Sequence, residues 1–287
     1  MRILRRIIII FALVIVALLL SLFLNDKANQ NVRTTRYTYT DKEIPSAFDG
    51  CRIMMISDLH DADFSEDIIE SIEKEKPDYV VMTGDMVQLP DSSIENTLKI
   101  ADAVTKMNIP IYAVSGNHDR QCGMYEEILA SLWAHDVYML EYDSVRFEKD
   151  GESIVLMGIQ DPKHDNVTDE KIAAIRGNIK NQLSRRKDYF TILLSHRADL
   201  YPQVKDTGVD LILSGHLHGG IVRLPFVGGL IDRDKKVSVF SDYEYGVYKE
   251  EGNATMIVSG GCDKNPAKRR LFNPPEILLI TLKGDQL

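Results

Sequence analysis

Short apolar runs recur along the chain, and most of them end in a polar loop. Runs of four to seven mainly hydrophobic residues occupy positions 52–56, 78–82, 111–114, 153–159, 189–194 and 209–213. Such runs, bounded by turn residues, are typical of buried β-strands. Stretches with helical apolar spacing separate several of them, at 65–76, 94–106, 125–134 and 169–186. Strands that alternate with helices predict βαβ units and a largely parallel sheet.

Three further strands and two helix starts complete the predicted domain. Residues 33–40 alternate between polar and apolar positions, which predicts an edge strand, and 255–259 and 277–282 are two apolar runs near the C-terminus. Ser65 and Thr168 each precede acidic residues and a helical pattern, so each is predicted to be a helix N-cap.

The longest apolar run, residues 7–24, contains no charged residue. A helix of this length, at about 1.5 Å per residue, nearly spans a bilayer core of about 30 Å. The run is longer than most signal-peptide cores and no small-x-small motif follows it, which favours an uncleaved anchor over a cleaved signal. A buried helix of a soluble protein is the third alternative. Because Arg2, Arg5 and Arg6 precede the run, we expect a single-pass protein of the cell membrane whose domain is extracytoplasmic.

The chain is therefore predicted to have three parts. Residues 1–24 form the membrane anchor, 25–31 a polar tether, and 32–287 one large α/β domain. The 287 residues are 44% hydrophobic and 27% charged, as in ordinary globular proteins. The formal net charge of -9 argues against a nucleic-acid partner but is compatible with a small phosphorylated substrate held by metal. Three scattered cysteines form neither a disulfide framework nor a structural zinc motif.

Side chains that can bind metal follow the predicted strands directly. They are Asp58, His60, Asp85, Asn117, His118, His196, His216 and His218. Five of the seven histidines of the chain belong to this set. Carboxylate, imidazole and amide ligands suit Mn, Fe, Zn or Co, and they argue against calcium or a thiolate zinc site. The set is too large for one ion, so two divalent ions are predicted.

The polar clusters form an ordered series of motifs. These are Asp58-x-His60, Gly84-Asp85, Gly116-Asn117-His118-Asp119, His196 and Gly215-His216-x-His218. The series resembles the calcineurin-like metallophosphoesterases. Gly219-Gly220 and the Asn-Pro-Pro-Glu run at 273–276 are similar to the membrane-associated bacterial branch of that family. The resemblance implies a four-layer αββα sandwich, preceded here by one N-terminal transmembrane helix.

The resemblance also implies a role for each motif residue. One metal ion would be held by Asp58, His60 and His218. The other would be held by Asn117, His196 and His216, with Asp85 between the two. Paired ions would activate a water molecule for in-line attack on phosphorus. His118 would stabilise the transition state or protonate the leaving oxygen, and Asp119 would orient it.

The chain departs from the family pattern at two places. Gln88 stands where an acid is common, which concerns the support around the ligands. The segment 259–262 differs from the usual run, which leaves the pocket rim and the substrate open. Arg197 is expected either to contact phosphate or to lie in solvent. The basic residues Lys264, Lys268, Arg269 and Arg270 are expected to be an exposed loop, with contact to anionic headgroups as the alternative.

The predicted function is hydrolysis of phosphodiester or phosphomonoester bonds in cell-envelope substrates. The alternative is a lipid pyrophosphatase that splits UDP-2,3-diacylglucosamine, for which residues 219–248 should form an apolar rim. That lipid is made on the inner face of the membrane, which conflicts with the predicted topology. The non-enzyme alternative is an inactive metal-binding relative.

Overall fold

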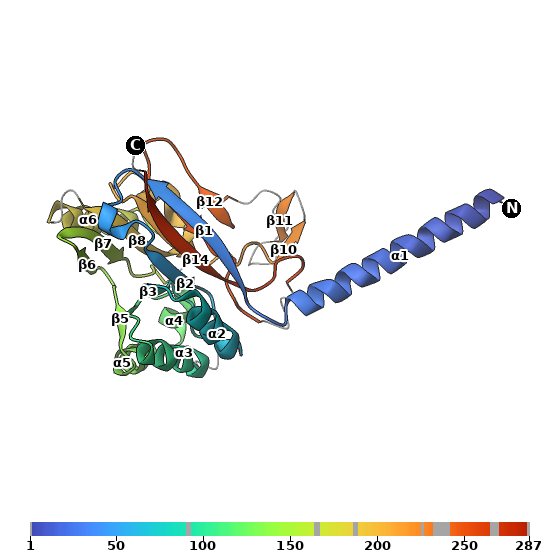
Figure 1. The fold of residues 1–287 in the computed structure, drawn as a ribbon, viewed down its shortest axis with the longest axis horizontal. Coiled ribbons are helices and arrows are strands. Elements are labelled where there is room, and N and C mark those ends of the chain that lie inside the picture. The colour runs from blue at the N-terminus through green and yellow to red at the C-terminus, as the bar shows by residue number, and fades with distance from the viewer. Residues whose placement is uncertain are drawn as a thin grey trace.

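The computed structural model describes residues 2–89, 93–163, 167–185, 189–224, 227–231, 242–264 and 270–285. Figure 1 shows a body of two β-sheets with surrounding helices, from which one long helix projects. The alternation of apolar runs and helical stretches predicts a largely parallel sheet, and parallel strands form the centres of both sheets. The mixed α/β sandwich that the family resemblance implies is confirmed.

The first sheet has six strands and a parallel centre. In spatial order they are β1 (Arg33–Asp41), β14 (Glu276–Gly284), β2 (Arg52–Ile56), β3 (Tyr79–Met82), β4 (Ile111–Ala113) and β5 (Val137–Met139). Strands β2 to β5 run parallel, and Ile56, Met82 and Ala113 lie at one level in the register. The loops after β2, β3 and β4 therefore start at the same edge of the sheet.

The second sheet also has six strands, of which the inner four are parallel. In spatial order they are β12 (Gly246–Tyr248), β13 (Thr255–Val258), β9 (Leu211–Gly215), β8 (Phe190–Arg197), β7 (Glu152–Gly158) and β6 (Ser144–Lys149). The outer strands β12 and β6 pair antiparallel with their neighbours. A separate hairpin consists of β10 (Val222–Leu224) and β11 (Gly228–Ile231).

Helices cover the outer faces of the two sheets. They are α2 (Ser65–Glu75), α3 (Glu95–Lys106), α4 (Asn117–Gln121), α5 (Tyr125–Ala134), α6 (Asp169–Ser184) and α7 (Tyr201–Val204), with 3-10 turns η1 (Ser46–Phe48) and η2 (Ala198–Leu200). Figure 1 shows α2, α3 and α5 grouped beside the first sheet, with α6 beside the second.

Three buried hydrophobic clusters fill the spaces between the layers. Neighbouring residues of a strand point to opposite faces. Met54 therefore packs toward α2 and α3, while Met55 packs between the two sheets. In the second sheet Leu194 lies in that same central cluster, and Leu193 packs toward α6 and α7. Because both faces of these strands are buried, they are continuous apolar runs in the sequence.

Helix α1 (Arg2–Ala28) is the one described helix that is long and apolar enough to cross a membrane. The body of the protein covers none of its apolar window, and a signal sequence would meet the same criteria. The helix extends through residues 25–28, which belong to the predicted tether. Its only buried residue is Asn25, which bonds to the segment before β14. The polar end of α1 is therefore attached to the domain.

Most predicted elements lie within two residues of the observed ones. The prediction that Ser65 is an N-cap is wrong by one position: Phe64 takes that place, and the Ser65 hydroxyl bonds Asn96. The N-cap role of Thr168 is confirmed, because its side chain accepts a bond from the Lys171 backbone N–H. Residues 186–188, at the predicted end of α6, lie outside the described part of the chain.

Candidate metal centre

The carboxyl ends of both sheets bring the predicted ligands together. Three groups have possible ligand atoms within 4.8 Å of one another: Asp58, His60 and His218; His60, Asp85 and His118; and Asp85, His196 and His216. Asn117 begins α4 beside them and is buried. Residues up to 160 positions apart in the sequence are thus assembled by the segments that follow β2, β3, β4 and β9 and by the last residues of β8, where His196 lies.

Five of these residues have left-handed backbone conformations. The φ angles are 52° for Asp58, 48° for His60, 54° for Asp85, 76° for His216 and 51° for His218. Residues other than glycine rarely adopt positive φ, because the Cβ atom is then crowded. Such strain concentrates at functional sites, where the surrounding structure holds it in place. It turns the chain sharply at each strand end and directs the side chain into the site.

Two glycines allow the carboxylates to approach the neighbouring loops. A Cβ atom on Gly116 would lie 2.2 Å from Asp85 Oδ1, and one on Gly215 would lie 2.3 Å from Asp58 Oδ2. Only hydrogen at these positions leaves room for the acids. The spacing of the Gly-Asn-His-Asp and Gly-His-x-His motifs therefore follows from packing as well as chemistry.

Asp85 lies between the two halves of the site. Its Oδ2 is 3.6 Å from His60 Nε2, and its Oδ1 is 3.4 Å from His196 Nε2. The backbone N–H of His118 also donates to Asp85 Oδ1, at 2.8 Å. Burial alone would raise the pKa of Asp85, but His196 and the other histidines outweigh it and hold the pKa well below its usual range. Asp85 is thus an ionised carboxylate shared by both halves.

The ring of His196 has a defined orientation. Its Nδ1 lies 2.8 Å from the carbonyl oxygen of Thr83, and a carbonyl can only accept, so Nδ1 carries the proton. Nε2 is left facing Asp85 and His216 Nδ1, the latter at 3.1 Å. A backbone partner of this kind commonly fixes the tautomer of a metal-binding histidine.

The buried polar atoms of the centre fit divalent cations. Both ring nitrogens of His60 and Asp85 Oδ2 are buried and make no hydrogen bond to the described residues. Leaving such atoms without partners costs free energy, and metal coordination would remove that cost. Burial lowers the pKa of His196, but Asp85 and the other acids outweigh it and raise the pKa to about 10, the direction expected where carboxylates surround a buried ring. The donor set therefore fits metal ions with nitrogen and oxygen ligands.

The carboxylate of Asp119 binds the backbone of the loops around the site. It accepts backbone N–H bonds from Asp85 at 2.8 Å, Val87 at 3.0 Å and Gly116 at 2.7 Å. These bonds hold the loop after β3 against the start of α4. The predicted role of Asp119, orienting His118, stays a prediction.

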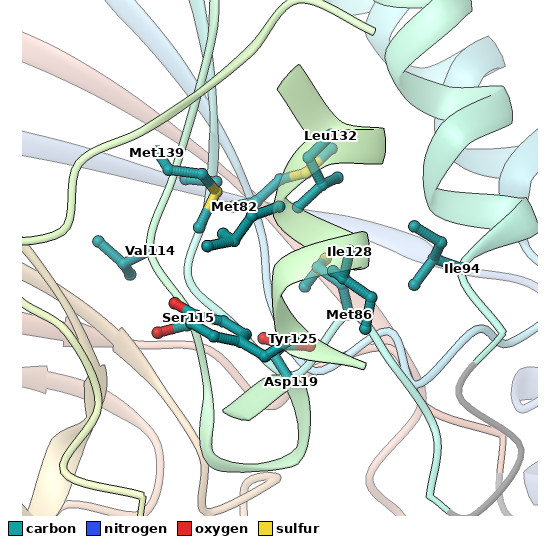
Figure 2. A pocket seen from close by; sticks show the side chains of 12 residues that line it. Met82, Met86, Ile94, Val114, Ser115, Asp119, Tyr125, Ile128, Leu132 and Met139 are labelled. Carbon is teal, nitrogen blue, oxygen red and sulfur yellow. The ribbon is translucent and has the colours of Figure 1, made fainter. Parts of the chain in front are cut away.

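The surroundings of Asp119 are mainly apolar. Figure 2 shows it with Ser115 and Tyr125 at a small cavity among methionine, leucine and isoleucine side chains. The cavity has about 10 Å³, room for one water molecule and not for a substrate. Burial, and next the charge of Asp85, raises the pKa of Asp119 to about 6. This pocket therefore serves the packing of the loops.

Arg197 lies in the core of the site, so the prediction of a solvated arginine is wrong. Its Nε donates to Asp161 Oδ2 at 2.9 Å, and its Nη1 lies 3.0 Å from His216 Nε2. All three side chains are buried. The carboxylate of Asp161 compensates the charge that the arginine brings beside His216. The phosphate contact that was also expected of Arg197 stays a prediction.

Asp263 and Arg270 are site residues that the sequence patterns did not indicate. Asp263 Oδ1 lies 3.1 Å from His218 Nδ1, and Arg270 Nε donates to the same oxygen at 2.8 Å. Burial favours a raised pKa for Asp263, but Arg270 and then His218 outweigh it and keep the pKa well below normal. The prediction of an exposed basic loop is wrong for Arg270, whereas Lys268 and Arg269 lie outside the described residues. The position of Asp263 after β13, at the same sheet edge, was the available signal.

The other distinctive positions stabilise this centre or lie away from it. Asn273 donates through its amide to the carbonyl oxygens of His218 at 2.7 Å and Gly220 at 3.2 Å, which holds the histidine loop. His135 caps α5 and lies 3.7 Å from Asp102, outside the clusters. His164 lies outside the described residues.

Comparison with known proteins identifies the family. The profile described as calcineurin-like phosphoesterase matches residues 51–220. The chain is 31% identical over 265 residues to the uncharacterized metallophosphoesterase YkuE of Bacillus subtilis, covering 88% of this chain and 86% of that one. It is 29% identical over 263 residues to an uncharacterized metallophosphoesterase of Aquifex aeolicus, covering 88% and 92%.

A relative with a named activity is also similar. Phosphodiesterase YaeI of Escherichia coli is 28% identical over 187 residues, which are 62% of this chain and 64% of that protein. The profile match includes every predicted ligand, from Asp58 to His218. On the strength of that match, the chain belongs to the calcineurin-like phosphoesterase family.

Proposed function

We propose that the protein is a phosphoester hydrolase that requires two divalent metal ions and acts on phosphodiester or phosphomonoester bonds of cell-envelope substrates. The observation that carries the proposal is the place of Asp85, a buried carboxylate within 3.6 Å of His60 on one side and 3.4 Å of His196 on the other. A carboxylate shared in this way suits a pair of ions. The relative YaeI is named a phosphodiesterase, which favours phosphodiesters over phosphomonoesters as substrates.

The chain's residues divide into two ligand sets in this proposal. Asp58, His60 and His218 would hold one ion; Asn117, His196 and His216 would hold the other, with Asp85 contributing to both. The ions, Mn, Fe or Zn, would neutralise phosphoryl charge and lower the pKa of a water molecule near neutral pH. The protein itself would fix the positions of the ligands and exclude solvent from the buried side of the centre.

His118 would act on the reacting group directly. It lies in the first turn of α4, and its ring meets that of His60 edge-on with centroids 4.6 Å apart. Its backbone N–H donates to Asp85, so the position of the ring is tied to the shared carboxylate. An imidazole placed there could donate a proton to the leaving oxygen or stabilise negative charge on phosphoryl oxygens.

Activity of the full-length protein in detergent tests the proposal. We expect hydrolysis of bis-p-nitrophenyl phosphate, p-nitrophenyl phenylphosphonate or p-nitrophenyl phosphate in the presence of Mn, Fe, Zn or Co, and its loss in a chelator. Absence of hydrolysis with every metal, in a protein that still binds two ions, would establish the inactive metal-binding relative instead.

Detergent-dispersed UDP-2,3-diacylglucosamine belongs in the same assay. Within the segment predicted as an apolar rim, Leu224, Val227 and Val247 are exposed, whereas 225–226 and 232–241 lie outside the described residues. A strong preference for the acylated nucleotide over water-soluble diesters would replace the envelope substrate with the lipid pyrophosphatase. It would also reverse the proposed topology, because that lipid is made on the inner face.

The proposed location is the cell membrane, with α1 as the single span and the catalytic domain on the extracytoplasmic side. The uncovered apolar surface of α1 and the arginines at its start support this topology. We expect a reporter fused to the C-terminus to behave as exported, and the protein to stay in the membrane fraction after a high-salt wash. Release of a shorter soluble form would show a cleaved signal.

A further inference from the structure

A row of buried side chains leads from the metal centre toward α1. His218 Nδ1 lies 3.1 Å from Asp263 Oδ1, and a carboxylate accepts, so Nδ1 carries the proton. Arg270 donates to that same oxygen through Nε at 2.8 Å and through Nη2. All three residues are at most 7% exposed. One carboxylate oxygen of Asp263 therefore contacts both the ring of His218 and the guanidinium of Arg270.

The contact with Asp263 leaves one ring nitrogen of His218 for the centre. With Nδ1 protonated, Nε2 has an open lone pair and lies 3.7 Å from Asp58 Oδ1. A carboxylate behind a metal-binding histidine fixes its tautomer and increases its basicity. Asp263 is in none of the three ligand groups, so its carboxylate acts behind His218.

Arg270 is in turn held by the end of α1. Its carbonyl oxygen accepts from Asn25 Nδ2 at 3.0 Å and from Asn29 Nδ2 at 2.8 Å. Asn25 Oδ1 also accepts from the backbone N–H of Phe272 at 2.6 Å. Asn25 is the one buried residue of a helix that is mostly exposed. Its contacts keep the backbone of 270–272 in place, and this places the guanidinium over Asp263.

We propose that Asp263 is a positioning residue for His218, and that the polar end of α1 positions Arg270, which holds Asp263. The first helix would then be a structural part of the metal centre as well as an anchor. This inference rests on the proposed function, since it assigns His218 to one of the two ions.

The central test uses full-length protein in detergent with Asp263→Ala and the isosteric Asp263→Asn. Metal binding is measured by chelator competition, and the His218 tautomer by ¹⁵N NMR of metal-free protein. We expect Asp263→Ala to lower the affinity for one of the two ions about 10- to 100-fold, the usual effect of losing such a partner. The other ion should keep its affinity. Asp263→Asn keeps an acceptor for Nδ1 and should lose less.

Matched controls separate positioning from general damage. Asp206→Ala removes another aspartate-arginine pair, with Arg176, away from the centre, and should leave both ions unchanged. The double variant Asn25→Ala with Asn29→Ala should lower the affinity for the same ion that Asp263→Ala affects, by a smaller factor. Asn31→Ala, an exposed asparagine just beyond the helix, should have no effect.

The two possible failures are distinguishable. If Asp263→Ala and Asp263→Asn bind both ions as tightly as the parent and His218 keeps its tautomer, Asp263 is only the partner of Arg270 and the inference is overturned. If the asparagine pair has no effect while Asp263→Ala does, the part assigned to α1 is overturned. If the parent binds no divalent ion, the proposed function fails, and the NMR tautomer still decides the contact between Asp263 and His218.

Discussion

Replacing Asp85 with asparagine is expected to remove most bound metal and nearly all hydrolysis. Asn has the same shape and keeps an oxygen for the His118 backbone N–H, so the loop should still fold. It lacks the negative charge that both halves of the site face, at 3.6 Å from His60 and 3.4 Å from His196. Because bound ions would supply several kcal/mol of transition-state stabilisation, kcat/KM should fall by about 10³ or more. Metal content by mass spectrometry and kcat/KM on a diester measure the effect.

A half-buried aspartate away from the metal centre provides the control for this change. Asp210 accepts from the Thr191 backbone N–H at 2.7 Å, at the amino end of the second sheet and far along the strands from the metal centre. Asp210→Asn should keep both ions and the parent rate. Two ions bound to Asp85→Asn with parental affinity would contradict the shared role of this carboxylate.

Replacing His118 with alanine is expected to preserve metal binding and to lower the rate by about 10² to 10⁴, the usual worth of a general acid or base. The loss should depend on the leaving group if His118 protonates the leaving oxygen. A p-nitrophenolate leaves readily without a proton, whereas a phenolate needs one. The rate of His118→Ala should therefore fall more on a phenyl phosphate ester than on the corresponding p-nitrophenyl ester. Initial rates on both esters with saturating metal measure the difference.

The alternative for His118 is a role as metal ligand. Its ring lies in one ligand group with His60 and Asp85, all within 4.8 Å. Loss of one ion per molecule in His118→Ala would show this role and remove the assignment as acid. An equal loss on both esters, with both ions retained, would instead indicate stabilisation of phosphoryl charge.

Local signals in the sequence predicted the strands of the two sheet centres and the residues that follow them. The runs at 52–56, 189–194 and 209–213 are apolar at every or nearly every position because both faces of the strands are buried. Parallel strands end at a common edge, so polar residues after them were expected to meet. The three ligand groups at that edge agree with this reasoning.

Short elements at the edges had weaker signals. Strands β5, β10 and β12 have three residues each, and β6 has no buried residue, so their sequences show too little apolar periodicity to be recognised. Helix α4 has five residues and starts at Asn117, a predicted ligand. Such elements form because their neighbours provide hydrogen bonds and packing, which local propensity does not record.

The sequence by itself determined the βαβ units with their parallel strands, the apolar first helix and the side chains that could bind metal, because these follow from periodicity, from run length and from residue chemistry at strand ends. The sandwich architecture was implied by the resemblance of the motif series to a known family. Only the tertiary structure decided what stands behind those side chains. Asp161 compensates Arg197, Asp263 and Arg270 support His218, and Asn25 reaches the segment before β14 across 245 positions of sequence. The reason is physical: whether a charged residue is exposed or buried depends on which distant chain segment packs against it, and no local pattern contains that partner.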